Sequence, residues 1–419
     1  MPDTFASSFT AVFLAALGIS VAIRIWLASR QIRHVCASRD RVPAEFADRV
    51  ALEAHRKAAD YTVAKVRFGF VALTVETALL LALTLGGGID ALAAWWQARW
   101  PALTAGLGLI FSLLLISGAV DLPLAWWRQF VIEARFGFNR MTPGLFLADT
   151  LKSALLAAVI GAPVILAVLW LMETMGSYWW LHVWLFWCCF NLLILFIYPT
   201  WIAPLFNKFE PLAEGEVRQR VEALLARCGF HSGGLFVMDG SRRSAHGNAY
   251  FTGFGKTKRI VFFDTLLKRL QPAEIEAVLA HELGHFKRRH VVKRIITMFA
   301  LSLLFLAALG QLIAAPWFYA GLGVGAEVQG TAVALVLFFV AMPAFVFPLT
   351  PLGSMLSRKH EFEADHYAAQ HANSEDLVHA LVKLYEDNAA TLTPDPLHSL
   401  FYDSHPPAAI RIAHLKVVT

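Results

Sequence analysis

The stretch His281-Glu282-Leu283-Gly284-His285 contains two histidines and a glutamate whose spacing suits metal-assisted hydrolysis. Residues four apart lie on one face of an α-helix, so His281 and His285 can ligate the same ion. Glu282 then lies beside the ion, where it can act as a general base and take a proton from metal-bound water. Catalytic zinc uses three protein ligands and keeps one position open, so the pattern predicts a zinc hydrolase that needs one more ligand.

The third ligand is expected in the second polar segment, within Glu361-Phe362-Glu363-Ala364-Asp365. Glu361 and Asp365 are one helical turn apart and share a face. We assign Glu361 as the metal ligand. Asp365 is predicted to accept the free ring N–H of a ligand histidine and so fix its tautomer. Glu363 is predicted to point elsewhere on the same helix.

Three further histidines lie near these motifs in the sequence and are weighed as alternative ligands: His290, His360 and His366. No ligand is missing once Glu361 is counted, so we expect these rings to face solvent or lipid headgroups. The four cysteines lack the spaced pairs that a thiolate zinc site requires. One Zn²⁺ per chain is therefore the predicted cofactor.

The elements around these motifs are mostly apolar. Of the 419 residues, 57% are hydrophobic and 16% are charged, and the mean hydropathy is +0.55. Runs long enough to cross a bilayer predict seven transmembrane helices, at about 7–27, 69–89, 101–120, 153–172, 179–199, 295–315 and 330–350. Glu76 lies within the second run, so it is expected to face the bundle interior or a water-filled space.

Basic residues alternate between the links that join these runs. The first, third and fifth links are basic, whereas the second link contains only Arg99 and the fourth and sixth links contain no Lys or Arg. This distribution predicts a multi-pass protein with its N-terminus outside and its C-terminus in the cytoplasm. The net charge of +5 then belongs to loops near anionic headgroups. No basic patch interleaved with aromatic residues suggests nucleic-acid binding.

The polar segments predict how the chain is divided. We expect an N-terminal membrane domain of five helices (1–206), a first part of the zinc domain (207–294), helices six and seven (295–350) and a second part (351–419). Residues 31–67 are expected to form an amphipathic helix or helix pair on the cytoplasmic face. The first part is predicted to contain a helix and a small β-sheet, with the helix at 214–227, strands at 234–238, 248–253 and 259–263, and a turn at 255–258.

Motifs along nearly the whole chain resemble integral-membrane zinc metalloendopeptidases of the CAAX prenyl protease 1 type. They are Val131–Asn139, Tyr198-Pro199, Ile202–Phe209, Asn248–Phe251, Arg259–Leu266, His281–His285, Ser357-Arg358, Glu361–Asp365, Asp395-Pro396 and Ser404–Pro407. The resemblance implies a mainly α fold, in which seven membrane helices form a barrel around a water-filled chamber. A gluzincin-like zinc domain with a small sheet is expected to cap this barrel.

The resemblance also implies roles for further residues. It agrees with Glu361 as the third ligand. Asn248, Ala249 and Tyr250 resemble the edge strand on which these proteases hold the substrate backbone, by main-chain pairing. His405 is expected to donate to the tetrahedral oxyanion, and Arg411 is expected at the substrate site. Ile410 replaces the family's usual glutamate, which puts an ion pair at that position in doubt.

Three functions remain open from the sequence. The first is a zinc endopeptidase that removes the C-terminal tripeptide from prenylated proteins at the membrane. The second is a membrane quality-control zinc protease, and the third is a transporter or channel with a structural metal. The expected partners are a peptide or protein substrate, possibly prenylated, and the lipid bilayer. We expect a prokaryotic inner membrane because the C-terminus has no KDEL-like address, with the ER membrane as the alternative.

Overall fold

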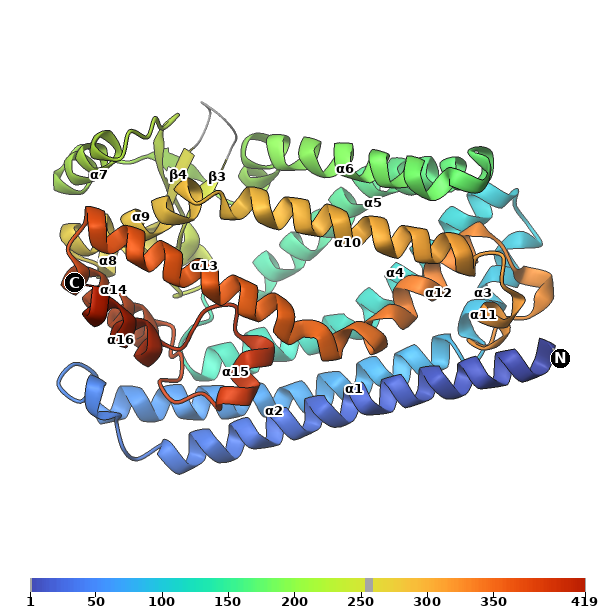
Figure 1. Ribbon diagram of the computed structural model, residues 1–419, viewed down its shortest axis with the longest axis horizontal. Coiled ribbons are helices and arrows are strands. Elements are labelled where there is room, and N and C mark those ends of the chain that lie inside the picture. Colours follow the sequence, from blue (N-terminus) through green and yellow to red (C-terminus); the bar gives the residue numbers. More distant parts are fainter. Residues whose placement is uncertain (1, 253–258, 419) are drawn as a thin grey trace.

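The computed structural model describes residues 2–252 and 259–418. Long helices run side by side along the longest axis of the molecule, and a small sheet lies at one end together with several shorter helices (Figure 1). The C-terminus lies at this end and the N-terminus at the other. The mainly α membrane architecture with a small sheet is therefore confirmed.

Seven helical segments of the described chain are long and apolar enough to cross a membrane, as predicted. Their bounds are Thr4–Ser38, Leu52–Leu83, Ala102–Glu133, Pro143–Thr174, Gly176–Leu205, His290–Leu312 and Thr331–His371. They contain the helices α1 (Pro2–Ser38), α2 (Leu52–Leu83), α4 (Ala102–Trp127), α5 (Pro143–Thr174), α6 (Trp179–Ile197), α10 (His290–Leu312), α12 (Thr331–Val346) and α13 (Thr350–His371).

These segments are longer than the predicted spans. Helix α1 continues to Ser38 and α2 begins at Leu52, so residues 31–67 are not a separate amphipathic helix pair as predicted. They are extensions of two spans joined by residues 39–51, which contain a 3₁₀ turn at Ala44–Phe46. The extensions form because charged residues continue the helical pattern beyond the apolar stretch, and hydropathy alone does not detect them. The last span likewise continues through α13 to His371, and this continuation contains Glu361.

Two apolar environments surround the membrane helices. Large side chains such as Leu115, Leu155, Phe196 and Trp201 are exposed on the outside, where lipid would cover them. A second set, including Phe13, Leu109, Leu169 and Leu337, is buried between the helices. The short helices α3 (Gly88–Gln97) and α11 (Pro316–Ala320) join spans at the end far from the sheet.

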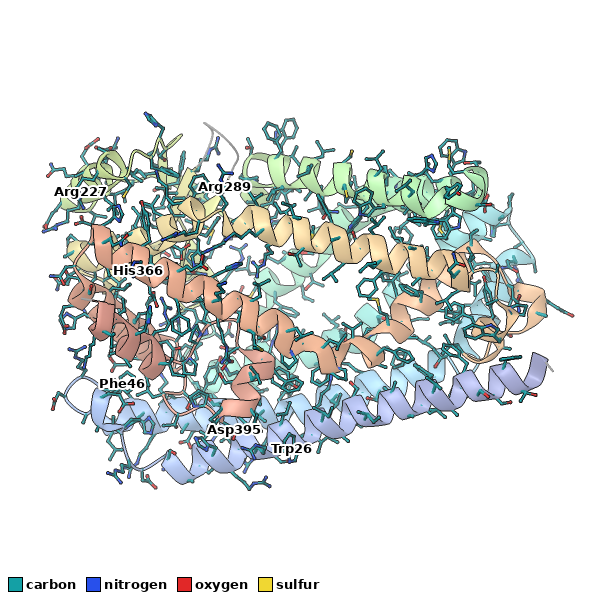
Figure 2. All side chains as sticks on the ribbon, in the orientation of Figure 1. Trp26, Phe46, Arg227, Arg289, His366 and Asp395 are labelled. Atoms are coloured by element: carbon teal, nitrogen blue, oxygen red, sulfur yellow. The ribbon has the colours of Figure 1, made fainter. Side chains whose placement is uncertain are left out.

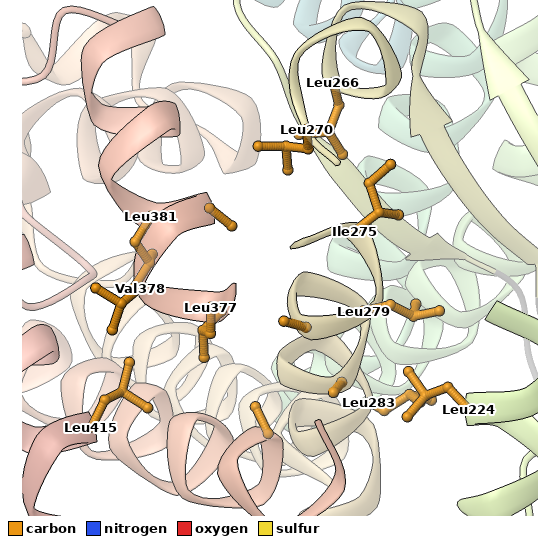
Figure 3. Close-up of a cluster of buried hydrophobic side chains, with 14 of the residues drawn as sticks. Leu224, Leu266, Leu270, Ile275, Leu279, Leu283, Leu377, Val378, Leu381 and Leu415 are labelled. Atoms are coloured by element: carbon orange, nitrogen blue, oxygen red, sulfur yellow. The ribbon is translucent and has the colours of Figure 1, made fainter. Parts of the chain in front are cut away.

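The remaining helices belong to the end that contains the sheet (Figure 1). They are α7 (Glu216–Arg227), α8 (Asp264–Arg269), α9 (Pro272–Lys287), α14 (Ser374–Asp387), α15 (Pro396–Tyr402) and α16 (Ala408–Val418). The apolar faces of α7, α8, α9, α14 and α16 share one core (Figure 3), in which Leu224, Ile275, Leu283 and Leu377 are nearly or fully buried. Each such side chain contributes about 1.5–3 kcal/mol through burial. This core joins segments from before and after the last two spans.

The described residues form a four-stranded sheet in the order β1-β2-β4-β3. The strands are β1 (Phe209–Pro211), β2 (Leu235–Met238), β3 (Ala249–Thr252) and β4 (Arg259–Phe263). β2 and β4 are parallel, and the two outer strands are antiparallel to their neighbours. Three strands agree with the predicted ranges. β1 was not predicted, because three residues containing a proline lack a strand pattern, and the predicted turn at 255–258 lies outside the described residues.

Candidate metal centre

Helix α9 begins at a well-defined signal and carries the first two proposed ligands. Gln271 and Glu274 form a capping box, and Pro272 is the first helical residue. The Glu274 carboxylate also pairs with Lys383 of α14 at 2.6 Å. Ile275, Leu279 and Leu283 anchor one face of the helix in the core, so the other face presents His281 and His285.

Helix α13 approaches α9 very closely at Gly284, between the two histidines. A Cβ atom placed at Gly284 would lie 2.9 Å from the Cα of Ala364 and 3.0 Å from its carbonyl oxygen. No larger residue fits without moving a backbone. This contact puts Glu361 and Asp365, which flank Ala364 on α13, opposite the histidine pair.

The three predicted ligands meet at one point. His281, His285 and Glu361 each offer a ligand atom, and these atoms lie within 4.8 Å of one another. The Nε2 atoms of the two rings are 3.2 Å apart. Nε2 of His281 lies 3.5 Å from Glu361 Oε2, and Nε2 of His285 lies 3.3 Å from Oε1. Within the described part of the chain, this is the one group of three or more such residues that could hold a metal ion.

The donor set fits a divalent metal. Glu361 is 3% exposed, and its Oε2 atom is buried with no hydrogen-bond partner, which is costly unless a cation satisfies it. Burial and the Arg411 charge lower the pKa of His281, but hydrogen bonds to Asp365 and Glu361 raise it by more, to about 9. The carboxylates therefore favour positive charge between the rings, and two imidazoles with one carboxylate are the ligands of many catalytic zinc sites.

Asp365 lies behind His281 and is fully buried. Its Oδ1 is 2.8 Å from Nδ1 of His281, so the carboxylate can accept the ring proton and leave Nε2 for the metal. Arg411 of α16 holds the same carboxylate with two hydrogen bonds of 2.9 and 2.5 Å. Its Nη1 also lies 3.6 Å from Glu361 Oε2. Most of the Arg411 guanidinium is thus engaged by Asp365, and its predicted role in substrate binding stays a prediction.

His405 reaches the centre from the loop that follows α15. Its Nε2 lies 3.4 Å from Oε1 of Glu361, and its side chain is 60% exposed to the adjoining space. Arg358 of α13 donates to the carbonyls of Ser399 and Asp403 and so ties this loop to the ligand helix. His405 can therefore reach a substrate carbonyl at the metal.

Two cavities meet at the centre. One of about 1030 Å³ extends among the membrane helices, and its walls are mainly apolar, including Val168, Leu301 and Phe338. The other, of about 640 Å³, lies toward the soluble end and is lined by polar residues including Lys65 and Asn248. Three residues line both cavities: Glu282, Ser404 and His405. A chain passing from one cavity to the other would cross the proposed metal position.

β3 is an edge strand beside the second cavity. The N–H of Phe263 in β4 donates to the carbonyl of Asn248 at 3.0 Å, so the backbone carbonyl of Asn248 points into the sheet. Backbone groups alternate along a strand, so those of Ala249 face outward from the edge. The Asn248 side chain accepts the Ala249 N–H at 2.8 Å. Asn248 and Ala249 line the cavity, whereas Tyr250 lines a smaller one with Tyr198.

Two polar residues were missed or misplaced by the sequence reasoning. His290 is only 4% exposed, so the expectation that it faces solvent or headgroups was wrong. Lys65 was not singled out from the sequence, yet it lines the polar cavity. Glu76 pairs with Arg24 of α1 at 3.9 Å and is half exposed, and its predicted place in a wet chamber stays a prediction.

Comparisons with known proteins match both parts of the chain. Residues 31–208 match a model described as CAAX prenyl protease N-terminal, five membrane helices, and residues 211–419 match peptidase family M48. The CAAX prenyl protease 1 homolog of Homo sapiens is 33% identical and covers 97% of this chain and 96% of its own. CAAX prenyl protease 1 of Saccharomyces cerevisiae is 38% identical over 75% of this chain and 72% of its own.

A solved structure resembles the whole fold. The crystal structure of S. mikatae Ste24p superposes with a TM-score of 0.89 at 30% identity, covering 97% of this chain and 98% of that one. The shared fold extends over the membrane helices as well as the metal centre. The similarity is therefore one of complete architecture.

Proposed function

This chain belongs to the CAAX prenyl protease 1 type of peptidase family M48, and on that premise we propose that it removes the C-terminal tripeptide from prenylated proteins. The protein is a multi-pass membrane zinc metalloendopeptidase. A transporter with a structural metal is not supported. The observation that carries the substrate proposal is the junction of an apolar and a polar cavity at Glu282 and His405.

The chemistry is assigned to residues at this junction. His281, His285 and Glu361 would hold a zinc ion, which would act as a Lewis acid toward the scissile carbonyl and lower the pKa of bound water. Glu282 accepts the proton of the attacking water and passes it to the departing amine. His405 donates a hydrogen bond to the oxygen on which negative charge develops. Asp365, held by Arg411, keeps the His281 ring in its ligand orientation.

The two cavities match the two ends of such a substrate. The lipid chain on the cysteine would occupy the apolar cavity of about 1030 Å³ between the membrane helices. The peptide would lie in the polar cavity of about 640 Å³. A prenyl group buried among Val168, Leu301 and Phe338 would gain about 0.8 kcal/mol for each CH₂ removed from water. Lipid binding would thus place the bond after the cysteine at the metal.

The edge strand would hold the peptide backbone. Ala249 presents an outward carbonyl, and its N–H is paired only with the Asn248 side chain. A substrate carbonyl could replace that side chain as the acceptor. Main-chain pairing of this kind binds an extended peptide without reading its side chains.

Lys65 is the cation we assign to the substrate's C-terminal carboxylate. It lines the polar cavity, and its Nζ lies 4.1 Å from the centre of the Tyr61 ring. Lys65 forms no salt bridge among the described residues, and the carboxylates of Glu133 and Asp403 act on it only from beyond salt-bridge distance. The guanidinium of Arg411, which also lines the cavity, is already bound to Asp365. A free carboxylate entering the cavity would therefore find its partner in Lys65.

The orientation follows from the distribution of charge. We propose that the end with the metal centre faces the cytoplasm and that the N-terminus lies outside. Basic residues concentrate in the links and extensions at the end with the metal centre. A prokaryotic inner membrane is the proposed location, with the ER membrane as the alternative.

The decisive test uses two peptides of one sequence, one with a farnesylated cysteine three residues before its free C-terminus and one without the lipid. Cleavage sites and rates would be measured by mass spectrometry with the purified protein. We expect release of the tripeptide, with a clear preference for the farnesylated peptide. Equal rates, or cuts scattered along the peptide, would contradict prenyl recognition and support a quality-control protease.

The role of Glu282 is tested in the same assay. Glu282→Gln should retain zinc and lose cleavage by about 10²- to 10⁴-fold, the usual contribution of a general base. Glu276→Gln is the matched control, because this carboxylate lies on the same helix but pairs with Arg220 and Arg227. Cleavage by Glu282→Gln at the wild-type rate would refute the assignment.

A further inference from the structure

A tight turn after α9 brings a third histidine against the metal centre. Arg289 adopts the left-handed conformation, with φ of 57°, and α10 begins at the next residue (Figure 2). This conformation costs a non-glycine residue about 1–2 kcal/mol, so the remaining structure must enforce it. Its consequence is that the His290 ring folds back beneath His285 and is buried.

His290 connects the ligand to a carboxylate through two hydrogen bonds. Nδ1 of His285 lies 2.9 Å from Nδ1 of His290, and Nε2 of His290 lies 3.0 Å from Oε2 of Glu363. The His360 ring stacks on the His290 ring, with the two ring centres 4.0 Å apart and the ring planes at 12°. This stacking restricts rotation of His290. Lys293 lies 3.9 Å from the same Glu363 oxygen.

The direction of these hydrogen bonds follows from the metal. His285 must present the Nε2 lone pair to the ion, so its proton resides on Nδ1 and is donated to His290. His290 accepts on Nδ1, so its own proton resides on Nε2 and is donated to Glu363. In both hydrogen bonds, from His285 to His290 and from His290 to Glu363, one partner donates and the other accepts.

The two ligand histidines are thereby oriented from one helix. His281 is bonded to Asp365 directly, and His285 reaches Glu363 through His290. Both carboxylates lie on α13, which also supplies Glu361. Asp365 lies on the same face of α13 as Glu361 and reaches His281 directly. Glu363 lies two residues from both Glu361 and Asp365, on another face, so it reaches His285 only through the His290 ring.

We propose that His290 and Glu363 are positioning residues that hold His285 in its metal-binding tautomer and orientation. They act on the metal through His285, although His290 also forms part of the wall of the apolar cavity. This inference uses the zinc centre but does not depend on which peptide the enzyme cleaves. Its test therefore measures zinc binding without substrate.

The experiment compares zinc affinity by chelator competition in the full-length protein in detergent. His290→Leu, which removes both hydrogen bonds, should lower zinc affinity about 10- to 100-fold, the range for loss of an outer partner of a ligand histidine. Cleavage by this variant should return toward the wild-type kcat when zinc is raised. A purely structural defect would not be rescued by zinc.

Two further variants keep the test decisive if His290→Leu fails to fold. Glu363→Gln keeps the acceptor but removes its charge, so a smaller loss of zinc affinity, up to about 10-fold, is expected. His366→Leu is the control, because this histidine on α13 is bonded to Gln370 instead and should leave zinc affinity unchanged. Folded His290→Leu or Glu363→Gln with wild-type zinc affinity would overturn the proposal.

Discussion

Gly284 sets the distance between the two helices that hold the metal, so Gly284→Ala is a sharp test of the site. The added Cβ would meet the Cα of Ala364 at 2.9 Å and its carbonyl oxygen at 3.0 Å. Both are backbone atoms, so no side-chain rotation relieves the contact. The helices must separate, or the ligand histidines must tilt.

The size of the effect follows from these distances. Carbon atoms pack at about 3.5–4.0 Å, so the helices would move apart by about 0.6 Å or more at this point. Zinc sites keep ligand distances to within about 0.2 Å, so the histidine pair and Glu361 could no longer all bind without strain. Overpacking of a core costs about 1–3 kcal/mol. If this strain energy opposes zinc binding, the affinity for zinc falls about 5- to 150-fold.

The measurement is zinc affinity by chelator competition, with thermal unfolding of the zinc-bound protein beside it. Gly118→Ala is the matched control, because a Cβ at this exposed position of α4 meets nothing within 4 Å. It should leave zinc affinity unchanged. The reasoning is refuted if Gly284→Ala binds zinc within twofold of wild type and unfolds at the same temperature.

Three other outcomes are expected. Lys65→Met should lower cleavage of a peptide with a free C-terminal acid about 10- to 100-fold, the worth of a hydrogen bond to a charged group, and spare the matched C-terminal amide; loss of both substrates alike would argue against carboxylate recognition. Asn248→Ala should raise KM more than it lowers kcat in steady-state kinetics, because Asn248 arranges the edge strand that holds the peptide. A larger effect on kcat than on KM would instead place Asn248 in the chemical step. Asp395, near α1 and α15 in Figure 2, caps α15 and pairs with Arg30 at 2.9 Å. Burial raises the pKa of Asp395, but Arg30 and the His398 N–H lower it by more, so it lies below the ordinary value. Its stabilisation is therefore present above about pH 4 and is lost as pH falls through the depressed pKa. Asp395→Asn should unfold at lower temperature than wild type at pH 7, and the gap should narrow below pH 4; a gap independent of pH would exclude this linkage.

Much of the membrane architecture could be predicted from local composition. Crossing a bilayer requires about 20 apolar residues in a helix, and the seven runs are visible without any partner. The helix of His281 was also predictable, because its capping box and Pro272 are adjacent in the chain. The helical extensions at residues 31–67 were not predictable in this way, since they are stabilised by packing against the soluble end and not by lipid.

In the candidate site too, residues placed by local spacing were predictable, whereas residues placed by distant contacts were not. The four-residue spacing predicted that His281 lies beside His285 on one helix and that Glu361 lies beside Asp365 on another, because residues four apart share a helix face. His290 was misjudged because its burial depends on the left-handed Arg289 and on Glu363, which is 73 positions away in the sequence. Lys65 was overlooked because no local pattern distinguishes a lysine that lines a cavity from one in a basic loop.

Residue type and short spacing were thus sufficient for the metal, the hydrolytic chemistry and the number of membrane spans, since each depends on groups within a helical turn or on one continuous apolar run. The two cavities that meet at the metal centre and the hydrogen-bonded surroundings of His285 came only from the folded chain. They arise where α9, α13, the α15–α16 segment and the membrane helices meet, and such contacts between distant segments leave no periodic pattern in the sequence.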